Sequence, residues 1–144
     1  MTMHLIKLSV GSTSVKSMRE SIARRIHEDA DLGPIVEHHT RNMPKQRDAI
    51  LDGGSIYWIV KGHIIARSSI LDLRQDVNSD TGRKFCRICM SPDLVAVVPT
   101  KRRGFQGWRY FRDGDQPADL DDLGVEEAEI PIEMAAELRD LGLI

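Results

Sequence analysis

The segment SIYWIVK, residues 55–61, constrains the fold of this chain more than any other stretch. Its β-branched and aromatic residues favour an extended strand, and a glycine stands near each end of the run. Gly62 and His63 mark a tight turn, and a second strand-like segment, residues 64–73, follows directly. The pair predicts a β-hairpin in the middle of the chain.

Strand patterns also occur on both sides of this hairpin. Residues 4–10 alternate between apolar and polar side chains, and residues 34–43 have an extended pattern. After a polar, turn-rich connection over residues 75–82, three more strands are predicted at residues 83–90, 94–98 and 105–112. The chain is therefore rich in predicted strands.

Helix patterns are fewer. A long N-terminal helix is predicted from a capped start at Ser12, Thr13 or Ser14 to about residue 30. Its buried stripe is formed by Val15, Met18, Ile22 and Ile26. A short helix is predicted from Pro44 to a stop at Gly53-Gly54, and a C-terminal helix is predicted from Pro131.

This order of elements predicts an α+β fold. Runs of strands with few intervening helices favour a mixed, mostly antiparallel sheet that curls toward a small barrel. One long N-terminal helix and a C-terminal helix are expected to accompany it. The length of 144 residues suits one domain, residues 1–144.

The net charge of −2 hides an uneven distribution of charge. Residues 113–144 hold eleven acids and one base, Arg139, whereas residues 1–112 hold nineteen bases and eleven acids. The chain thus has a basic body, 1–112, and an acidic C-terminal segment, 113–144. A basic body favours a polyanionic partner. Alternatively, the acidic segment folds against the body and neutralises it.

Several classes of protein are not expected. The longest apolar run, around residues 56–60, is too short for a membrane helix, and no secretory signal is recognised, so a cytoplasmic protein is predicted. Cys86 and Cys89 match the C-x-x-C pattern, but on a strand their thiols point to opposite faces and no second pair exists. Two structural cysteines are expected, with no metal and no cofactor.

The segment KRRGFQGWRYFRDG, residues 101–114, combines five cations with four of the seven aromatic residues. Cations beside aromatic rings suit a single strand of nucleic acid, because phosphates pair with the cations and bases stack on the rings. The predicted contacts in this segment are Lys101, Arg102, Arg103, Trp108, Arg109, Tyr110 and Arg112. Alternatively, the phenylalanines belong to the core and the cations are solvated.

A second basic segment, HHTRNMPKQR, covers residues 38–47. Arg41, Lys45 and Arg47 lie near a predicted helix start and favour an anion such as phosphate. We expect these three residues to extend the nucleic-acid surface, with RNA as the first candidate partner. Two alternatives stay open: a small enzyme acting on nucleotides or phosphoesters through His39, or His38, and Arg41, and an interaction module that uses the acidic segment. A homodimer also stays open.

Five blocks of the sequence resemble a family of short bacterial proteins known only as a domain of unknown function. The blocks are HLIKL (4–8), HTRNMPK (39–45), LDGGSIYWIVKG (51–62), FQGWRY (105–110) and PADL (117–120). They are spread over most of the chain, so the resemblance implies one intact family member and no known activity. More distantly, the order short helix, glycine, strand, hairpin and basic strand is similar to the PUA-like superfamily of small RNA-binding barrels.

Overall fold

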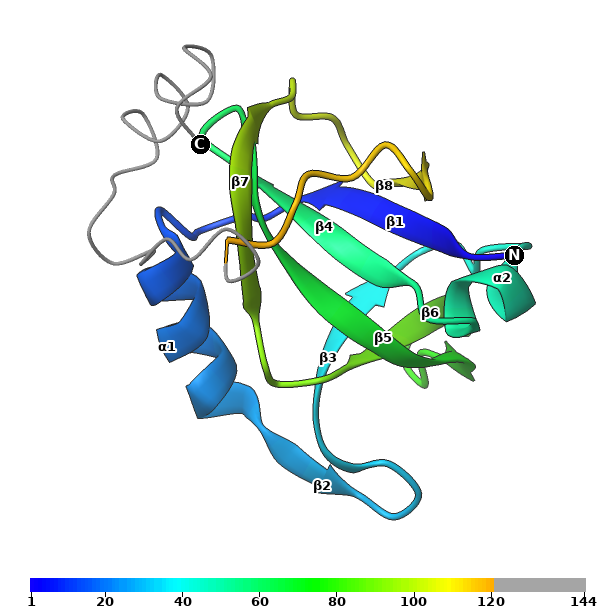
Figure 1. Cartoon of the computed structure of the whole chain (residues 1–144). Coiled ribbons are helices and arrows are strands. Elements are labelled where there is room, and N and C mark those ends of the chain that lie inside the picture. Colours follow the sequence, from blue (N-terminus) through cyan, green and yellow to red (C-terminus); the bar gives the residue numbers. More distant parts are fainter. Residues whose placement is uncertain (121–144) are drawn as a thin grey trace, which may run out of the picture.

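The computed structural model describes residues 1–120, which form eight strands and two helices. The elements are β1 (Met3–Leu8), α1 (Val15–Arg25), β2 (His27–Asp29), β3 (Gly33–Thr40), α2 (Arg47–Leu51), β4 (Ser55–Val60), β5 (His63–Val77), β6 (Lys84–Met90), β7 (Val95–Lys101) and β8 (Trp108–Arg112). The two helices lie at opposite ends of the sheet (Figure 1), and the N-terminus lies beside α2.

All eight strands belong to one mixed sheet. Its order is β2-β3-β6-β5-β4-β1-β8, and β7 pairs with β5 outside this path. The pair β1–β4 is parallel, and the other pairs are antiparallel. β5 is fifteen residues long and pairs with three strands: residues 63–69 pair with β4, 63–67 with β7 and 70–77 with β6.

The predicted hairpin is confirmed as β4 and β5. Its turn consists of Lys61 and Gly62, whose φ angles are 50° and 77°. Two successive positive φ angles are typical of the tight turn whose twist matches that of the flanking strands. Glycine takes this conformation at no steric cost. For Lys61 it costs some conformational free energy, because the Cβ comes close to the following carbonyl oxygen.

β4 is buried on both faces, which explains its continuous apolar sequence. Ile56 and Trp58 point into the larger of two apolar clusters, whereas Tyr57 and Ile59 point into a smaller cluster on the opposite face. Tyr57 and Trp58 are only 3% and 5% exposed. The sequence pattern placed the two rings on opposite faces, and the structure buries both.

The predicted fold class is wrong. The described chain is mostly sheet, and α1 has eleven residues in place of the long N-terminal helix. Ser14 caps α1 as predicted, but Ile26 has extended angles (φ −61°, ψ 132°) and is 45% exposed. Residues 27–29 then pair with β3 as β2. Backbone pairing with β3 therefore replaces the last turns of the predicted helix. The predicted C-terminal helix lies outside the described residues.

The sheet is curved, so that the chain after β3 reaches β8 near the other end of the strand order. The Trp108 indole Nε1–H donates to the Asn42 carbonyl oxygen at 3.0 Å. The Gln46 backbone N–H donates to the Tyr110 hydroxyl at 3.1 Å. These bonds bring β3, its following loop and β8 together. None of the helices in the described part of the chain is long and apolar enough to cross a bilayer.

Gly54 provides the first testable point of the fold. Its N–H donates to the Ile50 carbonyl at 2.8 Å and so caps α2, which supports a capping role for the glycine pair. A Cβ at Gly54 would collide with the backbone oxygens of Met3 and Ile50. We expect Gly54→Ala to lower the free energy of unfolding by about 2 kcal/mol or more, measured by urea denaturation.

Gly82→Ala is the matched control for this substitution. Gly82 has a φ of 69°, but an added Cβ meets no atom within 4 Å. It should therefore cost only the strain of a left-handed alanine, about 1 kcal/mol. Equal losses in the two variants would show that the backbone collision at Gly54 is relieved elsewhere.

Candidate functional site

β3 carries the two adjacent histidines and sends them to opposite faces. His38 packs edge-on against Trp58, with ring centroids 5.4 Å apart. His39 lies on the outer side, against Phe85 at 5.0 Å. The same strand therefore borders an interior cavity with one histidine and an open surface with the next.

The open surface consists of two adjoining hollows that we name the basic groove. Both hollows share His39, Thr40 and Arg41 at the end of β3. One, of about 580 Å³, is completed by Lys7, Asn42, Gln106, Gly107 and Trp108. The other, of about 360 Å³, is completed by Asn78, Thr81, Arg83, Lys84 and Phe85.

The charge of the basic groove has one sign. Four cations line it, namely Lys7, Arg41, Arg83 and Lys84, and among residues 1–120 no aspartate or glutamate lines either hollow. Within residues 1–120, no ion pair joins these four side chains to a carboxylate. An anionic ligand would meet them without having to displace a protein carboxylate.

Glu37 lies two residues before His39 on β3, and its carboxylate is already engaged. Its carboxylate accepts two hydrogen bonds from Arg87, at 2.6 and 3.1 Å, and lies 2.8 Å from His27. The hydrogen bond from Arg87 is the main cause that lowers the pKa of Glu37 to about 2, against the opposing effect of burial. His39 Nε2 lies 3.4 Å from the same carboxylate. Glu37 is thus a structural anion.

Two of the predicted nucleic-acid contacts, Arg41 and Trp108, lie together in the basic groove. Trp108 is half-buried, because its indole bonds to Asn42 and meets Tyr110 edge-on at 5.0 Å. Gly107, with a φ of 75°, sets the turn that leads into this ring. Tyr110 packs against the larger apolar cluster and does not line the groove.

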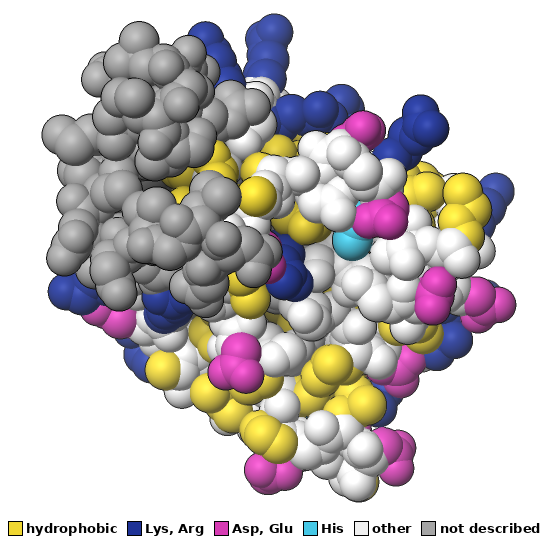
Figure 2. Space-filling view, in the orientation of Figure 1, with side chains coloured by type: hydrophobic (Ala, Val, Ile, Leu, Met, Phe, Trp, Pro, Cys, Tyr) yellow, Lys and Arg dark blue, Asp and Glu magenta, His cyan; other side chains and the backbone are white. Residues whose placement is uncertain are grey.

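The other predicted contacts lie elsewhere. Arg109 stacks over Phe105 at 4.1 Å, and Arg102 lies 5.9 Å from the same ring. Lys45, Lys101, Arg103 and Arg112 are exposed outside the groove. Lys and Arg side chains gather along the upper edge of the molecule in Figure 2, the side where Figure 1 shows the β7–β8 connection. Arg47 is held by Asp72 at 2.7 Å.

Three groove cations were not singled out from the sequence: Lys7, Arg83 and Lys84. Lys7 stands in an alternating strand, where a polar residue indicates only an outward face. It reaches the groove because β1 pairs with β8, which sets Lys7 opposite Trp108. Arg83 and Lys84 arrive with β6, the strand next to β3. Only strand order could reveal these neighbours.

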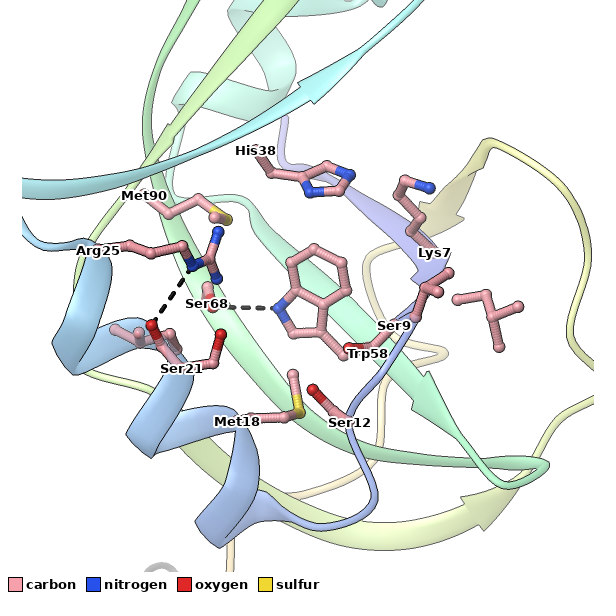
Figure 3. A pocket seen from close by; sticks show the side chains of 13 residues that line it. Lys7, Ser9, Ser12, Met18, Ser21, Arg25, His38, Trp58, Ser68 and Met90 are labelled. Atoms are coloured by element: carbon pink, nitrogen blue, oxygen red, sulfur yellow. Dashed lines mark hydrogen bonds between the residues drawn. The ribbon is translucent and has the colours of Figure 1, made fainter.

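A cavity of about 200 Å³ lies behind β3, and we name it the His38 cavity (Figure 3). Met18, Trp58 and Met90 give it apolar walls, and Ser12, Ser21 and Ser68 contribute hydroxyls. The indole N–H of Trp58 donates to Ser68 at 3.1 Å. Arg25 and Lys7 lie on opposite sides of the His38–Trp58 pair in Figure 3.

His38 is the unusual group of this cavity. Its Nε2 is buried and, within the described residues, is the one such side-chain atom without a hydrogen-bond partner. Burial is the main cause that lowers the pKa of His38 to about 4, and the charges of Lys7, Arg25 and His39 act in the same direction. The ring is therefore neutral at pH 7, and the charged groups that act on it within residues 1–120 are cationic.

A third, polar hollow lies next to β4, and four of the side chains that line it bond to one another or to the backbone. His4 accepts from the Ser55 N–H at 3.0 Å and donates to Asp113 at 2.9 Å, so both ring nitrogens are used. Arg67 holds Asp119 through two bonds, at 2.8 and 2.9 Å. These contacts fasten residues 113–119 to the sheet. They bring together three of the blocks that carry the family resemblance.

The cysteines are inert. Cys86 and Cys89 are both buried on β6, and burial raises the pKa of Cys86 to about 11. A thiol with a raised pKa is a poor nucleophile and a poor metal ligand at pH 7. No group of three or more potential metal ligands occurs among residues 1–120.

Comparison with known proteins gives one match. The model of a family described as protein of unknown function DUF1489 matches residues 5–144. The chain belongs to this family. The resemblance carried by the five sequence blocks is thereby confirmed. No curated protein and no solved structure matches the chain, so nothing supports a PUA-like relationship.

The low pKa of His38 makes a prediction for stability. A histidine titrates near pH 6.5 in the unfolded chain but near 4 in the folded one, so the unfolded state binds the proton first. The contribution of His38 is complete above pH 6.5 and is lost as the pH falls toward 4. Between pH 7 and pH 4.5 the wild type should lose roughly 2 to 3 kcal/mol through this group.

Urea denaturation at these two pH values measures the effect. His38→Gln should show a smaller loss of stability over the window, whereas His63→Gln, at the exposed β4–β5 turn, should lose as much as the wild type. The pH range ends at 4.5 because, below this pH, Glu37 also begins to lose its contribution to the free energy of unfolding. A His38→Gln variant with the full wild-type loss would contradict a neutral, desolvated His38.

Proposed function

We propose that the basic groove binds a single strand of nucleic acid. The observation that carries this proposal is the sign of its charge: four cations line the two hollows, and no carboxylate from the described part of the chain lines either. Phosphate contacts supply most of the affinity in sequence-independent binding, through the release of counterions. RNA is the expected partner, and DNA serves as the comparison.

The shape of the groove supports a strand over a compact anion. Cations occur along its whole length, from Lys7 and Arg41 beside β8 to Arg83 and Lys84 at the start of β6. Two rings, Trp108 and Phe85, lie in different hollows of the groove. Spaced cations with interleaved rings suit successive phosphates and bases, since aromatic stacking is tolerant of sequence.

An enzyme acting on phosphoesters is the second candidate. The observation that favours it is that His39 and Arg41 line the same hollows, so a base and a phosphate-binding cation lie together. However, the carboxylate beside His39 is Glu37, and Arg87 holds it. The hollows are also open to solvent, whereas many catalytic sites close over the substrate. Binding without chemistry therefore accounts better for the geometry.

Salt dependence of binding tests the proposal. Single strands lose affinity with salt at a slope of about −0.7 per neutralised phosphate, so four groove cations predict a slope of about −3. Arg41→Gln and Lys84→Gln should each weaken binding and reduce the slope by about 0.7. Fluorescence anisotropy with labelled RNA and DNA oligonucleotides measures both quantities.

Lys16→Gln on α1 is the matched control, because Lys16 is exposed on a helix that does not line the groove. It removes the same charge from the molecule and should leave the slope unchanged. If Lys16→Gln and Arg41→Gln reduce the slope equally, the groove is not the binding surface. Cleavage of the oligonucleotide that depends on His39 would instead support the enzyme.

A further inference from the structure

The His38 cavity contains a combination of groups that the fold alone does not need. His38 is among its lining residues, and the Nε2 of that ring is buried without a hydrogen-bond partner among residues 1–120. A buried polar group without a partner is costly, and such groups often await a ligand or a water molecule. The hydroxyls of Ser12 and Ser21 belong to partly exposed residues of the lining, whereas Ser68 is buried and accepts a bond from Trp58.

The size and lining of the cavity suit a planar ring. A dry cavity of about 150 Å³ holds one benzene molecule, and the His38 cavity measures about 200 Å³. Its walls combine the apolar side chains of Met18 and Met90 with the ring of Trp58. The hydroxyls of Ser12 and Ser21 at the same walls match a ring with polar edges better than a purely apolar one.

The cations around the cavity favour a ligand that has an anionic group on each side of its ring. Lys7 and Arg25 lie on opposite sides of the His38–Trp58 pair in Figure 3. Together with His39 they act on His38 as positive charges, and no anion among residues 1–120 is found to oppose them. A base within a strand has a phosphate on each side, which fits two separated cations. Lys7 also lines the basic groove, so the two sites are contiguous.

We propose that the His38 cavity receives one base of the strand whose phosphates lie in the basic groove. The base stacks within the walls formed by Trp58 and the methionines, and its polar edge faces the hydroxyls of Ser12 and Ser21. Lys7 and Arg25 meet the phosphates that flank it. This inference rests on the proposed function, because it takes the same strand as the ligand.

A cavity-filling variant tests the inference. Ser21 lines the cavity from α1, and Ser21→Met fills the space while keeping a good helix former. Ala23→Met, at an exposed position of the same helix, is the matched control. The ligands are a short single-stranded oligonucleotide and an abasic oligomer with the same length and backbone.

The wild type should bind the intact strand more tightly than the abasic one. Ser21→Met should reduce this ratio about fivefold or more, the effect of one stacked base, while Ala23→Met preserves it. The salt slope should stay the same in all three proteins, because no phosphate contact is removed. An unchanged ratio in folded Ser21→Met overturns the cavity inference and leaves the groove proposal standing. Absence of salt-dependent binding to either oligomer overturns both.

NMR spectra of the histidine rings give a test that needs no variant. Addition of the intact oligonucleotide should shift the resonances of His38, and those of His63 should stay in place. A His38 signal that does not move at saturation contradicts the inference. A free mononucleotide serves as a further ligand. If it binds as tightly as the oligonucleotide and Ser21→Met abolishes its binding, the cavity is a site for a free nucleotide. That result overturns the proposal that a base of a strand occupies it.

Discussion

The burial of β4 on both faces is the constraint on which the rest of the structure depends. A strand with no polar face has to be covered above and below, and here β4 packs into one apolar cluster with Ile56 and Trp58 and into another with Tyr57 and Ile59. It also has a neighbour on each edge, because β1 runs parallel to it and β5 antiparallel. The curved sheet supplies this cover, with β3 lying over the Trp58 side.

The same cover creates the two candidate sites. β3 crosses the Trp58 side of the sheet, and its alternation directs His38 inward and His39 outward. The cavity and the groove therefore lie on either side of β3 and meet at Lys7 of β1, which borders both. Because β3 is fixed by pairing with β6, neither histidine can move far without disturbing the sheet. The arrangement is a rigid one, which suits the preorganised recognition of a charged strand.

The cations of the described chain include one group that is paired with carboxylates in the sheet and another that lines the basic groove. Arginines that build the sheet are paired: Arg67 with Asp119, Arg74 with Asp29 and Arg87 with Glu37. The pairing lowers the pKa of Asp29 and of Glu37 and holds connecting segments in place. The cations of the groove have no such partners among residues 1–120. This contrast separates structural cations from those available to a ligand, and the net charge of the chain cannot show it.

The sequence by itself determined most of the strands, the β4–β5 hairpin, the capped start of α1 and family membership, because each rests on local pattern or local identity. It did not predict β2, and it placed the hairpin turn at Gly62-His63, one residue after its position at Lys61-Gly62. From residue type alone it led to the hypothesis that Arg41 meets a phosphate and Trp108 stacks on a base. Tertiary structure decided what depends on strand order: the end of α1, where β3 offers β2 a pairing partner, and the meeting of Lys7 with Trp108 through the β1–β8 register. It also decided that Arg47 is used by Asp72 and that His38 is enclosed beside Trp58. Side chains far apart in the chain acquire their neighbours only when the sheet curves, and local patterns contain no record of that curvature.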